Sequence, residues 1–184
     1  MNTAHRLLLP AALLCAAAAA WAAEDVFAFV PPGGRTLLAG VLASRPPAPE
    51  VNAMLAAKRT REEWQAWLRG HAGAMPALGK LSEKETATLA DYMAFNLPTA
   101  PGKPLPIDGR DMVLDKCQGC HIITVVVTQD RAREAWLGTM NKPSHVQIKL
   151  SKEQREALAN YLVLNAAIPI DDVPQELRAG GASY

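Results

Sequence analysis

The sequence predicts an all-α fold built from two small helical units in tandem, and three observations support this. Apolar residues recur at helical spacing in two segments, 82–96 and 151–165. Each segment begins with a serine that is followed three residues later by Glu or Gln, which is the capping box of a helix N-terminus. The chain also repeats itself: at an offset of 69 residues, ten of the 33 positions from 66 to 98 are identical. Unrelated chains of ordinary composition would match at about two of these positions.

Residues 1–22 have the pattern of a secretory signal peptide. A short basic head precedes an apolar stretch that ends near Trp21, and small residues fit a cleavage site before Ala23. A membrane anchor is the alternative, but the apolar stretch is short and Pro10 interrupts it. We therefore expect a mature protein in the periplasm without a stable membrane span.

The balance of charges and the cysteine count both depend on this cleavage. Removing residues 1–22 takes away one of the 19 Lys and Arg residues and none of the 18 Asp and Glu residues, so the mature chain has no formal net charge. Nothing therefore indicates a nucleic-acid partner. Cys15 leaves with the signal peptide, which makes Cys117 and Cys120 the only mature cysteines. A disulfide across C-x-x-C closes too short a loop to stabilise the fold much, so we expect these cysteines to carry chemistry.

The two helical units are expected at residues 23–99 and 107–169. A linker at 100–106 joins them, within the stretch 98–106 that is rich in proline and glycine. The remaining residues, 170–184, are expected to form a C-terminal tail. The boundaries follow from the prolines that stop the last helix of each unit.

Each unit is expected to contain a tryptophan-bearing helix before its capped last helix. These helices correspond to "TREEWQAWL" in the first unit and "DRAREAWLGTM" in the second. In the second unit a short helix, "DGRDMVLDKCQGCH", precedes both and leads into the cysteines. The β-branched run at 122–127 is expected to form a strand or an extended segment packed on an apolar surface.

The ungapped repeat indicates which residues of the two units correspond. It places Trp67 on Trp136 and Gly40 on Gly109. It also places 48–52, a segment without cysteine or histidine, opposite the cysteines. Whatever the two cysteines hold is therefore expected in the second unit only.

The sequence "CQGCH", residues 117–121, carries the strongest functional signal of the chain. C-x-x-C-H is the attachment sequence of c-type haem, in which the thiols add to the two vinyl groups and the histidine binds the iron. On a helical turn Cys117 and His121 lie on one face, so both can reach the same group. A redox-active cysteine pair would need a βαβ context, and a zinc site would need further ligands. We expect one covalent haem c.

With these motifs, residues 104–169 resemble a small class I cytochrome c domain, most similar to the haem domains of periplasmic dehydrogenase subunits. The resemblance rests on "DGRDMVLDKCQGCH", on "WLGTM" and on "LSKEQREALANYL". It implies that Cys117 and Cys120 form the thioethers and that His121 is the proximal iron ligand. It also implies that the first and last helices of the domain cross.

Two further expectations follow from the same resemblance. Gly109 and Tyr161 resemble the residues at which the first and last helices cross. Residues 36–98 resemble the fold only in their second half, as a copy of the domain that lacks its haem.

The second axial ligand of the iron is expected to be a methionine, as is usual in this family. Met140 is the candidate, since it follows His121 by 19 residues, a distance that the chain can span around the haem edge. The alternatives are that Met140 packs in the core and that His145 binds the iron. Met112 is not expected to be a ligand. Nor is His71, the residue that the ungapped repeat places opposite Met140.

Three side chains near Met140 are candidates for contacts with the haem propionates. Arg131 suits a carboxylate partner, as does Arg133, although both arginines can equally lie on a solvated helix face. The N–H of Trp136 can serve the same purpose, but a tryptophan is also present in the unit without haem. Packing is therefore expected to be its first role.

These features predict a periplasmic protein that transfers single electrons and is no enzyme on its own. We expect the haem subunit of an oxidoreductase complex, whose redox partner is a periplasmic dehydrogenase, with the first unit kept as a docking surface. The alternatives are a freely diffusing electron carrier, a ligand sensor or enzyme with an open iron site, and a binding module with a structural haem.

Overall fold

The computed structural model describes residues 25–178, and the regular structure of this part is entirely helical, which confirms the predicted all-α class. The predicted signal peptide, 1–22, and the end of the predicted tail, 179–184, lie outside the described residues. Within 25–178 the structure contains no helix with the length and apolar character needed to cross a membrane.

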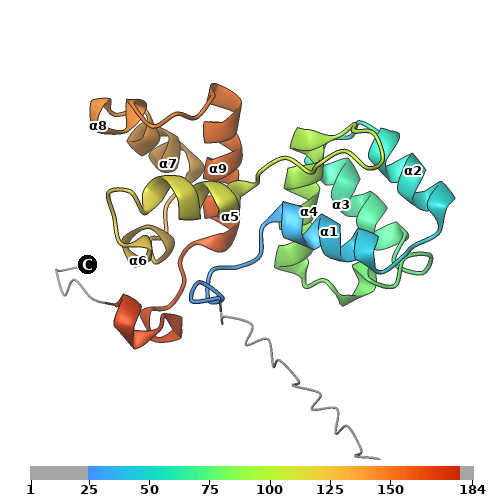
Figure 1. The fold of residues 1–184 in the computed structure, drawn as a ribbon, viewed down its shortest axis with the longest axis horizontal. Coiled ribbons are helices and arrows are strands. Elements are labelled where there is room, and N and C mark those ends of the chain that lie inside the picture. The colour runs from blue at the N-terminus through green and yellow to red at the C-terminus, as the bar shows by residue number, and fades with distance from the viewer. Residues whose placement is uncertain (1–24, 179–184) are drawn as a thin grey trace, which may run out of the picture.

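The helices form two groups that lie side by side and are joined by an extended connector (Figure 1). The N-terminal group comprises α1 (Gly34–Ala43), α2 (Ala48–Ala56), α3 (Arg61–Gly70), the short η1 (Leu78–Lys80) and α4 (Glu83–Asn96). The C-terminal group comprises α5 (Gly109–Met112), the π-helical turn η2 (Val113–Cys117), α6 (Ile123–Val127), α7 (Arg133–Met140), α8 (Pro143–Val146) and α9 (Lys152–Asn165). The short turns η3 (Ile170–Asp172) and η4 (Gln175–Leu177) follow α9.

Each group has its own hydrophobic core. Trp64 and Met93 lie at the centre of the N-terminal core, and both are fully buried. Ile123 and Trp136 belong to the C-terminal core. Val30 precedes α1 in the chain, yet it is buried in the C-terminal core.

The capping boxes predicted for the two long helices are confirmed. Ser82 Oγ accepts a hydrogen bond from the Glu85 N–H at 3.2 Å, and Ser151 Oγ accepts one from the Gln154 N–H at the same distance. In both helices the side chain of the third residue, Glu85 or Gln154, accepts a hydrogen bond from the backbone N–H of the serine. The local sequence thus sets where α4 and α9 begin.

The first and last helices of each group cross at a glycine that lies against a tyrosine. A Cβ atom added at Gly109 would lie 2.1 Å from Tyr161 Cβ, and one added at Gly34 would lie 2.1 Å from Tyr92 Cβ. The predicted contact of Gly109 with Tyr161 is therefore confirmed. The predicted correspondence of Gly40 with Gly109 is wrong, because a Cβ at Gly40 would meet nothing within 4 Å. Gly34 occupies that position instead.

The tryptophan correspondence is also shifted. Trp64, not Trp67, matches Trp136, since both are buried and both have an indole N–H without a hydrogen-bond partner. Each also lies under an arginine five residues earlier, Arg59 at 4.6 Å and Arg131 at 5.0 Å from the ring centre. The connections between helices differ in length in the two groups, so an ungapped repeat cannot align all of them.

The residues opposite the C-x-x-C-H motif change accordingly. Counting from the two crossing glycines places Leu42 opposite Cys117 and Pro46 opposite His121, rather than the segment 48–52. The corrected positions still contain no cysteine or histidine.

The strand or extended segment predicted at 122–127 is wrong beyond Ile122, because α6 occupies residues 123–127 and Ile122 is its extended N-cap. The β-branched side chains of Ile123 and Val127 pack in the core from a helix, so burial overrides their strand propensity. Thr124 Oγ1 donates to the Leu177 carbonyl at 2.7 Å, which ties the residues after α9 to this helix.

The two groups pack against each other mainly through α4 and α9. Asn160 donates a hydrogen bond to Asp91 at 2.9 Å, and Asn165 donates one to Thr88 at 3.0 Å. Asp91 and Asn160 occupy the same position of their capped helices. Contact between equivalent positions is typical of packing about a two-fold axis.

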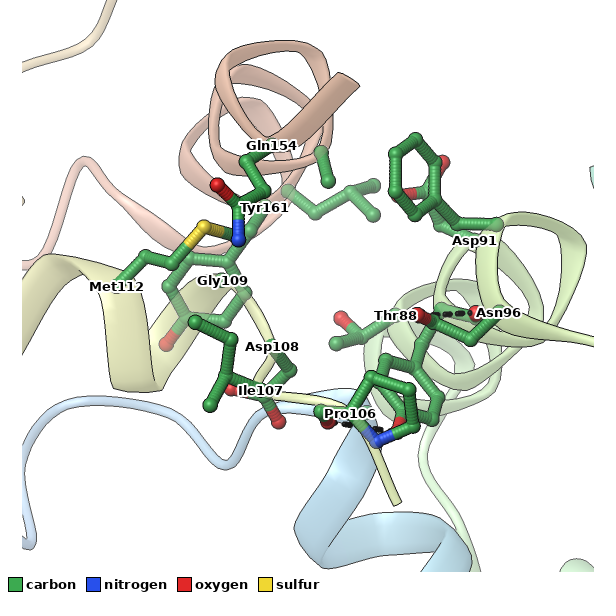
Figure 2. Close-up of a pocket in the computed structure, with 15 residues that line it drawn as sticks. Thr88, Asp91, Asn96, Pro106, Ile107, Asp108, Gly109, Met112, Gln154 and Tyr161 are labelled. Atoms are coloured by element: carbon green, nitrogen blue, oxygen red, sulfur yellow. Dashed lines mark hydrogen bonds between the residues drawn. The ribbon is translucent and has the colours of Figure 1, made fainter. Parts of the chain in front are cut away.

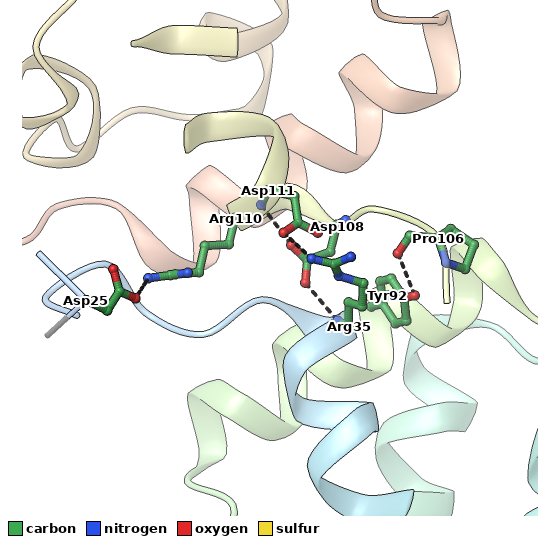
Figure 3. A network of polar contacts seen from close by, with 7 residues as sticks. All are labelled: Asp25, Arg35, Tyr92, Pro106, Asp108, Arg110 and Asp111. Atoms are coloured by element: carbon green, nitrogen blue, oxygen red, sulfur yellow. Dashed lines mark hydrogen bonds and ion pairs between the residues drawn. The ribbon is translucent and has the colours of Figure 1, made fainter. Parts of the chain in front are cut away.

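One carboxylate joins the N-termini of α1 and α5 (Figure 3). Asp108 caps its own helix by accepting the Asp111 N–H at 3.0 Å, and its other oxygen accepts the Arg35 N–H of α1 at 2.8 Å. A Cβ at Gly33, the N-cap of α1, would lie only 2.0 Å from this carboxylate. Asp108 thus caps α1 in place of a side chain at position 33. Burial raises the pKa of the Asp108 carboxyl.

The segments that lead into α1 and α5 are held by the opposite group. Tyr161 OH donates to the Pro31 carbonyl at 2.6 Å, and Tyr92 OH donates to the Pro106 carbonyl at 2.9 Å. Arg110 also reaches the first described residue, Asp25, at 2.7 Å (Figure 3). The groups are therefore interlocked through both connecting segments.

The helix crossings yield a prediction with a matched control. Gly109→Ala and Gly34→Ala should each destabilise the protein by about 1–3 kcal/mol, because the new methyl group overlaps a tyrosine that the fold holds in place. Gly40→Ala lies in open space on a helix and should stabilise it by up to about 1 kcal/mol. Urea denaturation measures all three variants. Equal stabilities of Gly109→Ala and Gly40→Ala would contradict the close contact of Gly109 with Tyr161.

The shared cap yields a second prediction. Asp108→Ala removes caps from two helices and should cost roughly twice the ~1 kcal/mol that a single cap contributes. Ser82→Ala, which removes one cap from α4, is the control. Thermal and urea unfolding compare the two, and a cost at 108 no larger than that at 82 would show that Asp108 does not serve both helices.

Candidate functional site

The C-x-x-C-H motif lies at the end of the helix that crosses α9. The capping box formed by Asp108 and Asp111 starts α5. The helix continues as the π-helical turn η2, which ends at Cys117. The Cys117 carbonyl then accepts the N–H groups of Cys120 at 3.4 Å and His121 at 3.1 Å. The second bond spans four residues, so the predicted helical turn between Cys117 and His121 is confirmed.

The two cysteines are free, and the environment of Cys117 does not favour a reactive thiolate. Cys120 is exposed, while Cys117 is half-buried and packs at the edge of the C-terminal core. Burial raises the pKa of the Cys117 thiol to about 11, so it stays protonated at neutral pH. Redox-active cysteine pairs instead have a thiol pKa below the ordinary value.

The imidazole of His121 is exposed and faces a second histidine. The ring centres of His121 and His145 are 6.0 Å apart, and their planes differ by 16°. The two planes are therefore nearly parallel, at a larger separation than the 3.9 Å between the stacked rings of His71 and Trp67. The structure therefore places two imidazoles close together in the C-terminal group.

A buried arginine holds the segment that carries His145. Arg155 is only 8% exposed and projects from α9 toward the loop between α7 and α9. Its guanidinium donates to the carbonyls of Met140 and Ile148, the latter at 2.8 Å, and lies 3.5 Å from that of His145. Ser144 Oγ is also 3.0 Å from His145 Nδ1. His145 is thus on an anchored loop.

The structure places Met140 in the C-terminal core, where it is 8% exposed, at the last position of α7. With the corrected register it corresponds to Leu68, which is buried in the N-terminal core, and not to His71. Ligation by Met140 remains a prediction. Met112 is likewise buried in the C-terminal core.

Two of the three candidates for propionate contacts, Arg131 and Trp136, lie together. Arg131 sits above the ring of Trp136, and the buried Trp136 N–H has no hydrogen-bond partner. Arg133 instead donates to Asn160 at 2.7 Å, near the contact between the two groups. Since Arg59 and Trp64 form the same pair in the N-terminal group, this pair alone does not distinguish the group that contains the cysteines.

Exposed apolar side chains flank both histidines. Ile122 follows His121 and is 44% exposed, and Val146 follows His145 and is 60% exposed. Leaving such side chains in water is unfavourable, and grouped exposed apolar residues mark surfaces that bind other apolar groups. Each of the two histidines is thus followed by an exposed apolar side chain.

His71 has a different environment, as expected for a residue that is not a ligand. It ends α3, stacks on Trp67, and its Nδ1 lies 2.8 Å from the Trp67 carbonyl. Its Nε2 is 3.8 Å from Glu50. A local polar contact therefore occupies each ring nitrogen.

A small cavity of about 90 Å³ lies between α4 and α9, beside the helix crossings (Figure 2). Met112 and Tyr161 face it from one side, and Thr88 and Asn96 face it from the other. None of the predicted site residues lines it. Over residues 25–178 no group of three or more His, Cys, Asp and Glu side chains converges in a way that could hold a metal ion.

Sequence reasoning gave His145 a minor place and missed Arg155. A signal for Arg155 was present, because it lies on the apolar face of α9 together with Leu158 and Leu162, and the equivalent residue of α4 is Thr86. A charged residue on an inner helix face indicates a buried partner. Its partners are backbone carbonyls, which no side-chain pattern reveals.

Comparison of the chain with protein-family models, with curated proteins and with solved structures found no match.

Proposed function

We propose that this protein is a periplasmic c-type cytochrome that carries one haem on Cys117 and Cys120 and transfers single electrons. The observation that carries the proposal is the C-x-x-C-H turn at the end of a helix that crosses the last helix, Gly109 against Tyr161.

The residues around the motif fit the chemistry of a haem. Its ring is apolar and its propionates are anionic. Ile122 and Val146 supply exposed apolar surface, and the unpartnered N–H of Trp136 and the guanidinium of Arg131 supply donors for a carboxylate. When bound, the haem supplies an iron that cycles between two oxidation states one electron apart.

Each residue of the motif has a separate task. The thiols of Cys117 and Cys120 would each add across a vinyl double bond of the haem, with sulfur joining one carbon and the proton joining the other. His121 would hold the iron through a ring nitrogen. Because Cys120 and His121 lie at the surface, a haem held there is within reach of a redox partner.

The N-terminal group is proposed to be a copy of the same unit without a haem site. The glycine–tyrosine crossing and the arginine–tryptophan pair support this, because both occur in each group. A third shared feature is a backbone hydrogen bond from the residues that follow each capped helix to an earlier helix of the same group. The Thr99 N–H donates to the Leu55 carbonyl at 2.9 Å, and the Ile168 N–H donates to the Val127 carbonyl at 3.0 Å.

The retention of this copy has an intramolecular reason. Its contacts with α9, such as Asp91 with Asn160, brace the helix that crosses the haem-bearing segment. Partnership with a periplasmic dehydrogenase as its haem subunit is still proposed. Purification from the native periplasm tests it: co-elution of a dehydrogenase supports the subunit role, and elution of the cytochrome alone supports a diffusing carrier.

Haem attachment itself is tested by changing the cysteines. The double variant Cys117→Ser, Cys120→Ser should lose all covalent haem, because a hydroxyl does not form the thioether. Gln118→Ala is the matched control, since it lies within the same turn and should keep its haem. Both are expressed in a periplasm with cytochrome c maturation, and haem is detected on a denaturing gel and by the pyridine haemochrome spectrum. Wild-type protein without covalent haem would refute the proposal.

A further inference from the structure

We propose, on the basis of the haem site proposed above, that His145 is the second axial ligand of the iron, which gives a bis-histidine centre. Met140 then packs in the core. The inference starts from the placement of two imidazoles, His121 and His145, in the same small region of the C-terminal group.

The spacing of these rings suits a shared metal ion. Metal–imidazole bonds of about 2.0–2.1 Å on each side place two axial nitrogens about 4 Å apart and the ring centres roughly 6 Å apart. The ring centres of His121 and His145 are 6.0 Å apart, and the planes are nearly parallel, at 16°. His71, stacked on its neighbour at 3.9 Å, has no such partner ring.

The loop is held in a way that suits a ligand. Arg155 has three carbonyls within 3.3 Å, those of Met140, Val146 and Ile148, which fixes the segment on both sides of His145. Burying a guanidinium is costly unless its N–H groups are bonded, so this arrangement is a specific feature of the loop. The N-terminal group has Thr86 in place of Arg155, and Thr86 bonds only within its own helix. The anchor thus occurs only in the group with the C-x-x-C-H motif.

Met140 has a packing role that explains its burial without ligation. It occupies the position of Leu68 in the repeat, and both are core residues of the tryptophan-bearing helix. Leucine cannot bind iron, and methionine commonly fills core positions of similar volume.

A bis-histidine centre has consequences for the redox role. Methionine ligation raises the reduction potential of a haem, so a second histidine leaves it lower. The iron also has no open coordination position, which argues against ligand sensing and favours electron transfer.

The test uses the mature, haem-loaded, full-length protein. The ferric wild type should show the low-spin EPR spectrum and near-infrared magnetic circular dichroism of bis-histidine coordination, without the far-red band of methionine ligation. His145→Ala should become high-spin and bind carbon monoxide in the ferrous state. His145→Met should restore low-spin coordination with the methionine band and a higher potential. Met140→Leu should keep the wild-type spectrum.

Each other outcome is distinct. A methionine band in the wild type that is lost in Met140→Leu overturns the assignment of His145 while leaving the electron-transfer proposal intact. Carbon monoxide binding by the wild type overturns both the assignment and the closed site. Absence of covalent haem refutes the proposed function itself. The wild-type spectra decide the question even where a variant fails to fold.

Arg155 is a positioning residue in this scheme, and it has its own test. Arg155→Met should increase the fraction of ferrous protein that binds carbon monoxide, because the loop no longer holds His145 in place. Arg133→Met, which removes the Asn160 contact, is the control and should not change that fraction. Equal carbon monoxide binding in the two variants, with both folded by circular dichroism, would show that Arg155 does not position His145.

Discussion

The close approach of a glycine to a tyrosine at the crossing of the first and last helices is the constraint on which the rest of the structure depends. At Gly109 no side chain larger than hydrogen fits against Tyr161, so α5 and α9 are fixed at contact distance. The C-x-x-C-H turn continues directly from α5 through η2, and its position is therefore set by this crossing. The same contact between Gly34 and Tyr92 orders the N-terminal group.

The polar groups at the crossings bind the two groups into one unit. The Asp108 carboxylate caps α1 and α5, and the two tyrosine hydroxyls each hold the segment leading into the opposite group (Figure 3). Burial also raises the pKa of both tyrosines, so they remain donors throughout the physiological range. Interlocking of this kind links the stability of the C-terminal group to that of its neighbour.

The proposed site lies at the far end of α5, away from this interface. Its components come from three places: the turn after η2, the anchored loop around α8, and the tryptophan-bearing helix α7. α9 serves both ends, since Tyr161 fixes the crossing and Arg155 fixes the loop. A single helix thus relates the position of the cysteines to that of His145.

The sequence by itself determined the helical class, the capped helices and the C-x-x-C-H turn, because each depends on a local pattern of residues. The crossing of Gly109 with Tyr161 was predicted only from the resemblance to a known family, and the crossing of Gly34 with Tyr92 was not predicted. The sequence misplaced Gly40 and Trp67 in the repeat, because connections of unequal length shift the register between helices. It also predicted a strand or an extended segment where α6 forms, because β-branched residues pack equally well from a buried helix. Only the tertiary structure brought His145 opposite His121, with Arg155 holding its loop. These are contacts between side chains and the backbone of distant segments, and no sequence period encodes them.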